Sequence, residues 1–201
     1  MPRAETWVAL GDQRDFLVVN RFAIRTPWLH GVATAYASYG IVLFGVVLIA
    51  GYVVARRRDD LVATARALLA GVGVLLAVAV NQPIVHAVGE QRPFDQLSGV
   101  LVLVHRSADA SFPSDHAVMA GATAVGLLFF SRRLGIVAVV AAVLMAVARV
   151  YVGVHFPLDV LAGLVVGATV AVLVQLAAQL LAAAMTPLTR GRWRPLVTTA
   201  P

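Results

Sequence analysis

GVATAYASYGIVLFGVVLIAGYVVA, residues 31–55, contains no charged side chain. A helix needs roughly 20 predominantly apolar residues to cross the hydrocarbon core of a bilayer, which is about 30 Å thick. This stretch exceeds that length. It therefore predicts a transmembrane helix and assigns the chain to a membrane.

Four further apolar stretches follow the first one along the chain. They cover residues 61–80, 114–131, 134–152 and 158–185. Of the 201 residues, 60% are hydrophobic and only 13% are charged, a composition far more apolar than that of a soluble domain. The sequence predicts an all-α, multi-pass membrane helical bundle of about five transmembrane helices, folded as one integral-membrane domain over residues 1–201.

Residues 1–28 precede the first predicted span and alternate apolar with charged side chains. A helix with this alternation lies in the membrane interface rather than crossing the bilayer. We therefore expect an interfacial N-terminal helix. Two alternatives stay open, a frayed polar tail and a sixth span.

Half of the basic residues gather on one side of the predicted bundle. All 16 are arginines, and the net charge is +6. Eight lie in the short segments 56–60 and 131–135 and in the tail 186–201, which the positive-inside rule places in the cytoplasm. The N-terminal segment, on the opposite side, carries four more, Arg3, Arg14, Arg21 and Arg25, against Glu5, Asp12 and Asp15. Because membrane topology accounts for these arginines, we predict no binding to nucleic acid.

Polar residues suited to chemistry gather on the opposite, extracytoplasmic face. That face receives residues 86–112, residues 149–159 and the start of the stretch that begins at Ser114. All five histidines lie on or near it, namely His30, His86, His105, His116 and His155. We interpret the first three as ordinary loop residues and examine the last two as candidates.

The first candidate segment is VGEQRPFDQ, residues 88–96. Pro93 disfavours helical conformation in the residue before it, so we expect an extended segment around Arg92. A guanidinium just outside the apolar layer is positioned to bind an anion.

The second candidate segment is FPSDH, residues 112–116. Ser114 is a good N-cap for the apolar helix that follows. The amide groups of Asp115 and His116 would then have no partner within the helix, and a helix start of this kind can bind phosphate. The alternative is that Ser114 is only a cap and His116 only a first-turn residue.

The third candidate segment is ARVYVGVHFPLDV, residues 148–160. Arg149 lies near the membrane boundary, where an arginine usually has a partner. Pro157 is suited to the first turn of the last helix, so His155 would precede that helix and Asp159 would lie in its first turn. The carboxylate can accept a hydrogen bond from one imidazole nitrogen and leave a lone pair on the other.

A His–Asp pair alone is often structural. Here two arginines, a helix start and a second histidine share the same face of the membrane with it. Together these groups supply a nucleophile and positive charge around a phosphoryl group, which is what phosphoryl transfer requires.

These segments resemble the signatures of the type 2 phosphatidic acid phosphatase (PAP2) superfamily, which are Lys-x6-Arg-Pro, Pro-Ser-Gly-His and Arg-x5-His-x3-Asp. In this chain they read VHAVGEQRP (85–93), PSDH (113–116) and RVYVGVHFPLD (149–159). The third is complete and the second nearly so. The order of the segments also matches, and the resemblance covers residues 60–180 approximately.

The chain departs from the family pattern at two positions. Val85 stands where the family has its lysine, so one cationic ligand is missing or is replaced, with the neighbouring His86 as a candidate. Asp115 stands where the family has glycine. This second change resembles the branch that acts on undecaprenyl diphosphate, the bacitracin-resistance type of phosphatase.

The resemblance implies a mechanism and roles for the residues. His155 would attack the terminal phosphorus and form a phosphohistidine, Asp159 would orient His155, and His116 would protonate the leaving oxygen. The implied phosphate-binding groups are Arg92, Ser114, Asp115 through its amide, and Arg149.

No metal or other cofactor is expected. The chain has no cysteine, and the spacing of Glu90, Asp95 and Asp109 matches no known metal loop. Because two guanidiniums and a helix start already supply positive charge, we expect EDTA to leave activity intact.

The predicted function is hydrolysis of undecaprenyl or another polyprenyl diphosphate to the monophosphate carrier lipid, a step in recycling the cell-wall lipid carrier. The expected partners are this lipid and the surrounding membrane lipids, and the sequence predicts no particular oligomeric state. One alternative is a phosphatase or phosphotransferase acting on phosphatidylglycerol phosphate, phosphatidate or a prenyl-phosphoryl sugar phosphate. A non-enzymatic protein that binds or transports lipid headgroups is the other.

Overall fold

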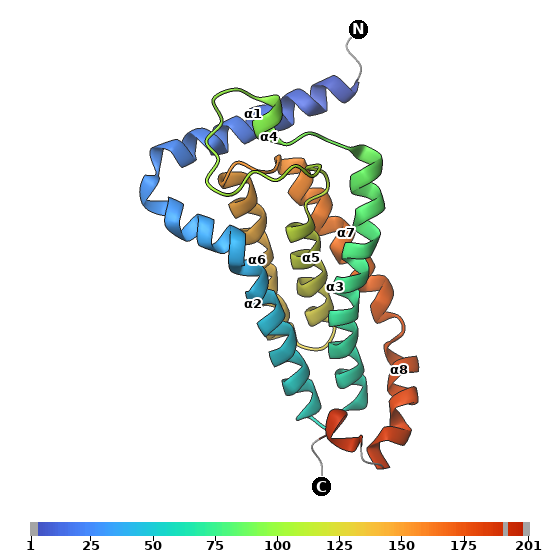
Figure 1. The fold of residues 1–201 in the computed structure, drawn as a ribbon. Helices are drawn as coiled ribbons and strands as arrows, with labels where there is room; N and C mark the ends of the chain where they lie inside the picture. Colours follow the sequence, from blue (N-terminus) through green and yellow to red (C-terminus); the bar gives the residue numbers. More distant parts are fainter. Residues whose placement is uncertain (1–3, 191–192, 199–201) are drawn as a thin grey trace.

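The computed structural model describes residues 4–190 and 193–198, and all of its regular elements are helical. Residues 1–3 of the predicted interfacial segment, and residues 191–192 and 199–201 of the predicted tail, lie outside the described residues. Most helices run side by side in one bundle, while α1 lies across one end of it (Figure 1). The main elements in chain order are α1 (Ala4–Arg25), α2 (His30–Arg56), α3 (Leu61–Val88), α4 (Pro93–Gln96), α5 (Asp115–Leu128), α6 (Arg132–Tyr151), α7 (Pro157–Gln175) and α8 (Ala178–Met185).

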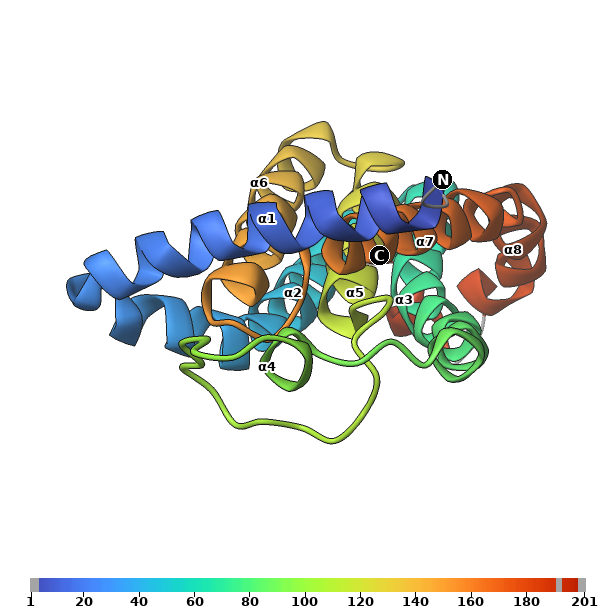
Figure 2. The ribbon, with the colours of Figure 1, turned by 90° about the horizontal axis from the view of Figure 1, so that it is seen from above.

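Short 3-10 turns complete the fold. One, Pro27–Leu29, joins α1 to α2, and the turns Thr186–Arg190 and Arg194–Leu196 follow α8. The long connection from α4 to α5 has no helix and arches over the bundle end that α1 also covers (Figure 2).

Four of the five expected spans are confirmed as helices long and apolar enough to cross a membrane. They are α2 with the preceding turn, α3 with its extension to Gln96, α6, and α7. Their outward faces carry exposed large apolar side chains such as Ile49, Leu75, Val140 and Val165. Apolar surface of this extent is covered by lipid rather than water. The chain is therefore a multi-pass membrane protein.

The prediction of a fifth full-length span over 114–131 is wrong in its length. Helix α5 has 14 residues and ends at Leu128, so it is about 21 Å long at 1.5 Å per residue. Nine of its residues are buried, because α3, α6 and α7 pack around it. A helix enclosed by other helices does not need the length that contact with lipid requires.

The last predicted span, 158–185, is also interrupted. Helix α7 ends at Gln175, whose buried side chain donates hydrogen bonds to the carbonyls of Arg66 (2.9 Å) and Gly126 (3.4 Å). The chain then turns and continues as α8, which packs against α3. The break at residues 176–177 thus comes directly after a buried, hydrogen-bonded amide. Hydropathy did not predict it, because the sequence is apolar on both sides of Gln175.

Helix α1 lies across the ends of the bundle helices in both views (Figures 1 and 2). It is not among the helices apolar enough to span a membrane in the part of the chain that the structure describes. A sixth span would run parallel to the bundle helices, whereas α1 crosses their ends. This orientation fits a helix at the interface.

Helices α5 and α7 approach closely through glycines. A Cβ atom at Gly167 would lie 2.0 Å from the carbonyl oxygen of Val118, and one at Gly163 would lie 2.6 Å from that of Ser114. The backbone amide of Ser114 donates to the carbonyl of Asp159 (3.1 Å). The glycines thus allow the start of α5 to touch the first turn of α7.

The two ends of the bundle differ in character. The arginines at 56–58 and the turns after α8 lie at the end where Figure 1 marks the C-terminus. The α4–α5 connection, the start of α5 and the α6–α7 turn lie at the opposite end, beneath α1.

Candidate active site

A pocket with a volume of about 810 Å³ opens beneath the α4–α5 connection. Helices α2, α3, α5 and α6 contribute to its wall, together with the connection itself. Five of the seven predicted site residues line it, namely Arg92, Asp115, His116, Arg149 and His155. The other two, Ser114 and Asp159, are fully buried next to them.

His155 occupies the turn between α6 and α7 and is only 2% exposed. Its Nδ1 atom lies 3.4 Å from Oδ2 of Asp159. Its Nε2 atom lies 3.3 Å from Nη1 of Arg92 and 3.3 Å from Nη2 of Arg149. Because guanidinium nitrogens only donate, Nε2 is the acceptor and the proton belongs on Nδ1, toward the carboxylate.

Asp159 is held by hydrogen bonds from two directions. Its Oδ2 atom accepts the backbone amide of Phe156 at 2.7 Å and the hydroxyl of Ser111. As expected from the sequence, Pro157 is the first residue of α7 and Asp159 lies in the first turn. The carboxylate therefore faces back toward His155.

Arg92 comes from the segment before α4. Its Nη1 donates to the carbonyl of Val154 and its Nε to that of Asp109, both at 3.0 Å. The exposed carboxylate of Asp109 adds an ion pair at 3.3 Å. Arg92 itself is extended, as expected, but Pro93 begins the short helix α4 instead of continuing an extended segment. Proline is well suited to the first position of a helix.

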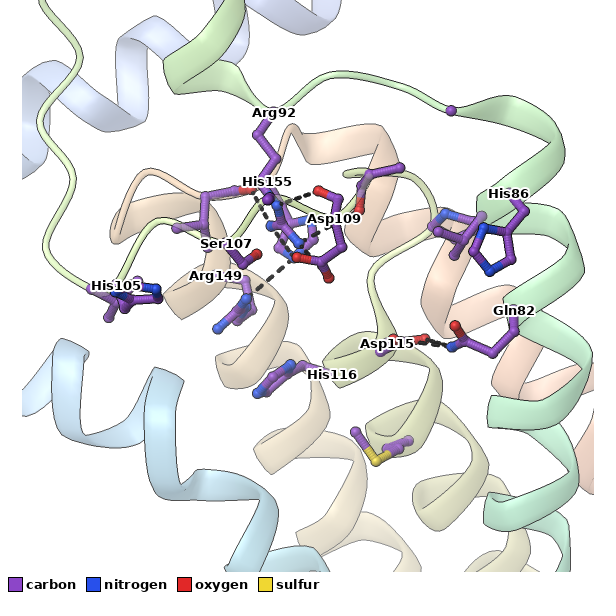
Figure 3. Close-up of a pocket in the computed structure, with 18 of the residues that line it drawn as sticks. Gln82, His86, Arg92, His105, Ser107, Asp109, Asp115, His116, Arg149 and His155 are labelled. Atoms are coloured by element: carbon purple, nitrogen blue, oxygen red, sulfur yellow. Dashed lines mark hydrogen bonds and ion pairs between the residues drawn. The ribbon is translucent and has the colours of Figure 1, made fainter.

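Arg149 reaches the site from the last turn of α6. It donates through Nη1 to the carbonyl of Ala37 in α2 at 3.3 Å, while Nη2 faces His155 (Figure 3). Two guanidiniums thus converge on one imidazole nitrogen. An anion bound over His155 would be within reach of both, and positive charge held in this way stabilises a phosphoryl group during transfer.

Ser114 is the N-cap residue of α5, but its hydroxyl makes no capping hydrogen bond. This corrects the expectation of an ordinary N-cap. The buried Oγ atom finds no hydrogen-bond partner among the residues that the structure describes. The hydroxyl is thus buried beside the pocket, without a capping role.

The side chain of Asp115 binds α3. Its Oδ1 atom accepts from the amide of Asn81 at 2.7 Å, and both carboxylate oxygens accept from the amide of Gln82 at 3.1 and 3.2 Å. Asn81 also donates to the carbonyl of Pro113 at 3.2 Å. Two α3 amides therefore fix the start of α5, and the carboxylate that replaces the family glycine is occupied by them. Figure 3 shows the contact with Gln82.

His116 lies in the first turn of α5 and is partly buried in the pocket wall, below Arg149 in Figure 3. Val85, where the resemblance places a lysine, lines the pocket and is 8% exposed. His86 lines it as well, from the last turn of α3. It is therefore a helical residue rather than the loop residue that we expected.

His105 lines the pocket from the α4–α5 connection, whereas His30 lies outside it and contacts the carbonyl of Ala23 at 2.9 Å. Within residues 4–190 and 193–198, no group of three His, Cys, Asp or Glu side chains is arranged to hold a metal ion.

Sequence reasoning missed Ser111. This fully buried residue donates its hydroxyl to Asp159 and lies 3.4 Å from Nδ1 of His155. Its backbone amide donates to the carbonyl of Glu90 at 2.7 Å. Ser111 thus connects all three candidate segments. Its place just before Phe112 and Pro113 was the available signal, but no local rule assigns a role to a serine there.

The surroundings of His155 set its charge. Burial, together with the positive charges of Arg149 and Arg92, lowers the pKa of its imidazole to about 4, against the opposing effect of Asp159. The ring is therefore neutral near pH 7 and has a lone pair on Nε2.

The chain matches known proteins across the segments that build this site. The family model of the PAP2 superfamily matches residues 66–186. Undecaprenyl-diphosphatase BcrC of Bacillus subtilis (strain 168) is 31% identical over 151 residues, 75% of this chain and 76% of that protein. Decaprenylphosphoryl-5-phosphoribose phosphatase of Mycobacterium tuberculosis (strain H37Rv) is 30% identical over 82% of this chain and 89% of that protein.

A solved structure is also similar. The crystal structure of a transmembrane PAP2 type phosphatidylglycerolphosphate phosphatase from Bacillus subtilis superposes with a TM-score of 0.62 at 28% identity, covering 86% of both chains. The matched residues 66–186 exceed half of this chain and include Arg92, the start of α5 and the His155–Asp159 turn. The pocket and its three converging segments thus lie within a known family, and this chain belongs to the PAP2 superfamily as a membrane phosphatase.

Proposed function

We propose that this phosphatase hydrolyses undecaprenyl diphosphate, or a closely related polyprenyl diphosphate, to the monophosphate carrier lipid and inorganic phosphate. The observation that carries the proposal is the position of His155. Its Nε2 atom lies 3.3 Å from both guanidiniums while Nδ1 faces a buried carboxylate. A nucleophile and the charges that bind the group under attack are thus held together.

The proposed reaction begins with attack of His155 Nε2 on the terminal phosphorus. A nitrogen–phosphorus bond forms, the bond from phosphorus to the bridging oxygen breaks, and Asp159 stabilises the positive charge on the imidazole. Arg92 and Arg149 bind the non-bridging oxygens. The hydroxyl of Ser114 and the amide of Asp115 add hydrogen bonds at the helix start, where the helix dipole favours an anion.

The leaving oxygen needs a proton, and we assign that role to His116. Burial and the nearby positive charges lower the pKa of its imidazole to about 3 in the free protein, so the negative charge of the bound diphosphate must raise that pKa for His116 to carry the proton it donates. A general acid must lie within hydrogen-bond reach of the oxygen in the bound complex, and His116 lines the same pocket as His155. Water then attacks the phosphohistidine, with His116 as base. This restores neutral His155 and releases phosphate.

We further propose that the site faces the outside of the cytoplasmic membrane. The arginines at 56–58 lie at the opposite end of the bundle, which the positive-inside rule assigns to the cytoplasm. A polyprenyl tail would remain in the bilayer while the diphosphate enters the polar pocket from the headgroup layer.

A monoester substrate is the second candidate. The structural relative carries the name of a phosphatidylglycerolphosphate phosphatase and the mycobacterial relative that of a prenyl-phosphoryl sugar phosphatase. Both names describe lipid phosphates whose headgroup binds through a phosphoryl group. The pocket chemistry around His155 serves a diphosphate and a phosphomonoester alike.

A substrate panel tests the proposal. Purified protein in detergent is given undecaprenyl diphosphate, phosphatidate, phosphatidylglycerol phosphate and decaprenylphosphoryl-5-phosphoribose, each with and without EDTA. We expect the highest kcat/KM for the diphosphate, loss of turnover in His155→Ala, and no effect of EDTA. A preference for a monoester would refute the substrate assignment. His155-independent turnover, or loss with EDTA that Mg²⁺ restores, would refute the mechanism.

A further inference from the structure

One face of α1 lies along the turn that carries His155. The contacts follow α1 at intervals of about one helical turn, at Asp12, Phe16 and Asn20, and continue at Thr26, just after the helix ends. Their partners are Leu158, Phe156, Leu101 and Tyr151, in that order. The chain of residues 151–158 therefore runs antiparallel to α1, with Leu101 contributed by the loop that covers this turn. Helix α1 lies outside residues 66–186, the part of the chain that the family model matches.

Asp12 binds the helix that carries Asp159. Its Oδ1 atom accepts the backbone amide of Leu158 at 3.0 Å. That amide belongs to the first turn of α7 and has no acceptor within its own helix. Asp12 is only 9% exposed. Helix α1 therefore places a buried carboxyl group against Leu158, the residue that directly precedes Asp159.

Phe16 packs beside the nucleophile. It is fully buried and meets the ring of Phe156 edge-on, with the ring centroids 5.4 Å apart. Phe156 directly follows His155 and donates its backbone amide to Asp159. A change in the position of Phe156 therefore moves both members of the His–Asp pair.

The remaining contacts fix the other side of the turn. Asn20 exchanges two hydrogen bonds with the backbone of Leu101. The carbonyl oxygen of Leu101 lies so close to Gly153 that a Cβ atom at position 153 would be only 2.2 Å from it. The hydroxyls of Thr26 and Tyr151 lie 2.8 Å apart.

We propose that α1 is a positioning element of the active site, with Asp12 and Phe16 as positioning residues for His155 and Asp159. The inference rests on the proposed role of His155. Apolar burial alone would attach α1 in many registers, but the buried polar groups Asp12, Asn20 and Thr26 each require a specific partner. Asp12 and Asn20 find that partner on the turn that carries His155 or on the loop over it, while Thr26 contacts Tyr151 at the end of α6 as well as carbonyls of its own segment.

The test compares kcat and KM for Asp12→Ala, Asp12→Asn and Asp15→Ala with those of the wild type, on whichever lipid phosphate of the panel is turned over fastest. The Asn side chain still offers an oxygen to the Leu158 amide. Asp15 is an exposed acid on the same helix and serves as the matched control. We expect Asp12→Ala to lower kcat about tenfold with KM within about twofold, because the loss affects positioning and not binding.

We expect Asp12→Asn to recover most of kcat and Asp15→Ala to match the wild type. Wild-type kcat in Asp12→Ala, or equal losses in the Ala and Asn variants, would overturn the inference while leaving the phosphatase assignment intact. Should Asp12→Ala fail to fold, Phe16→Leu decides, because it keeps an apolar side chain but removes the ring contact. A lower kcat at unchanged Tm supports the inference, and wild-type kcat contradicts it. A wild type without turnover would contradict the proposed function as well.

Discussion

Three different surroundings act on the ring of His155, the proposed nucleophile. Burial and two guanidiniums keep it neutral, a carboxylate fixes the proton on Nδ1, and Nε2 faces the pocket. Ordinary histidine titrates near pH 6.5 and would be partly protonated at mildly acidic pH. The position of this side chain, and not its identity, therefore gives the proposed nucleophile its lone pair.

This charge state predicts a titration. The pKa of His155 is lowered to about 4, so its ring should stay neutral at pH 5. Ring ¹⁵N chemical shifts measured between pH 4 and 8 would show this, with the resonance that disappears in His155→Gln identifying the residue. Protonation of that ring near pH 6.5 would contradict the account.

Ser111 gives the second prediction at the level of single residues. Its hydroxyl donates to the same Asp159 oxygen that faces His155. A hydrogen bond to a charged group contributes about 1.5–3 kcal/mol, so Ser111→Ala should lower kcat by a factor of about 10 to 100. Steady-state kinetics would measure this, with Ser107→Ala, which removes another pocket-lining hydroxyl, as the control. Equal kcat in the two variants would refute a role for Ser111.

At the level of helices, the site depends on how closely α5 and α7 pack. Gly163 faces the carbonyl of Ser114, the residue whose amide donates to Asp159. Small residues at such positions allow two helix backbones to approach within a membrane. The distance between the start of α5 and the first turn of α7, which carries Asp159, is thus set by glycines.

Gly163→Ala adds only one methyl group but should reduce activity strongly. The new Cβ would lie 2.6 Å from a carbonyl oxygen and 2.9 Å from Ala117 Cβ, so the helices must separate. We expect kcat to fall about tenfold or more, as for other small misplacements of catalytic groups, and Tm to fall with it. Gly71→Ala is the control, because nothing lies within 4 Å of its new Cβ. Unchanged kcat in Gly163→Ala would contradict this.

Helix identity was predictable from the sequence, but three helix lengths were not. Apolar runs predicted α2, α3 and α6 to within a few residues at most of their ends. The exception is the C-terminal end of α3, which extends eight residues beyond the predicted Val80, to Val88. The short length of α5 and the break after Gln175 depend on which helices surround them, and hydropathy does not contain that information.

For the whole molecule, the separation of charges between the two ends predicts how the protein sits in the membrane. The chain has no cysteine, so single cysteines can be introduced without background labelling. In intact cells, a membrane-impermeant maleimide should label Ala108→Cys, beside the pocket, but should label Arg57→Cys only after lysis. The reverse pattern would contradict an extracytoplasmic site.

The candidate site was predictable where its residues lie close together in the sequence, and not where segments distant in the sequence meet. Arg149, His155 and Asp159 lie within one short stretch, so their proximity follows from the chain itself. The contacts from Ser111 to Asp159 and from Asp12 to Leu158 join residues 48 and 146 positions apart. Only the folded arrangement brings these partners together.

The central claim is that His155 carries the phosphoryl group during turnover. Rapid-quench experiments with undecaprenyl diphosphate labelled with ³²P at its terminal phosphate test it most directly, comparing the wild type with His155→Ala and Asp12→Asn. We predict a transient phosphoprotein that is stable to base and labile to acid, as expected of phosphohistidine, in the wild type and in Asp12→Asn but not in His155→Ala. Equal labelling of His155→Ala, or turnover in the wild type without any labelled protein, would contradict the account.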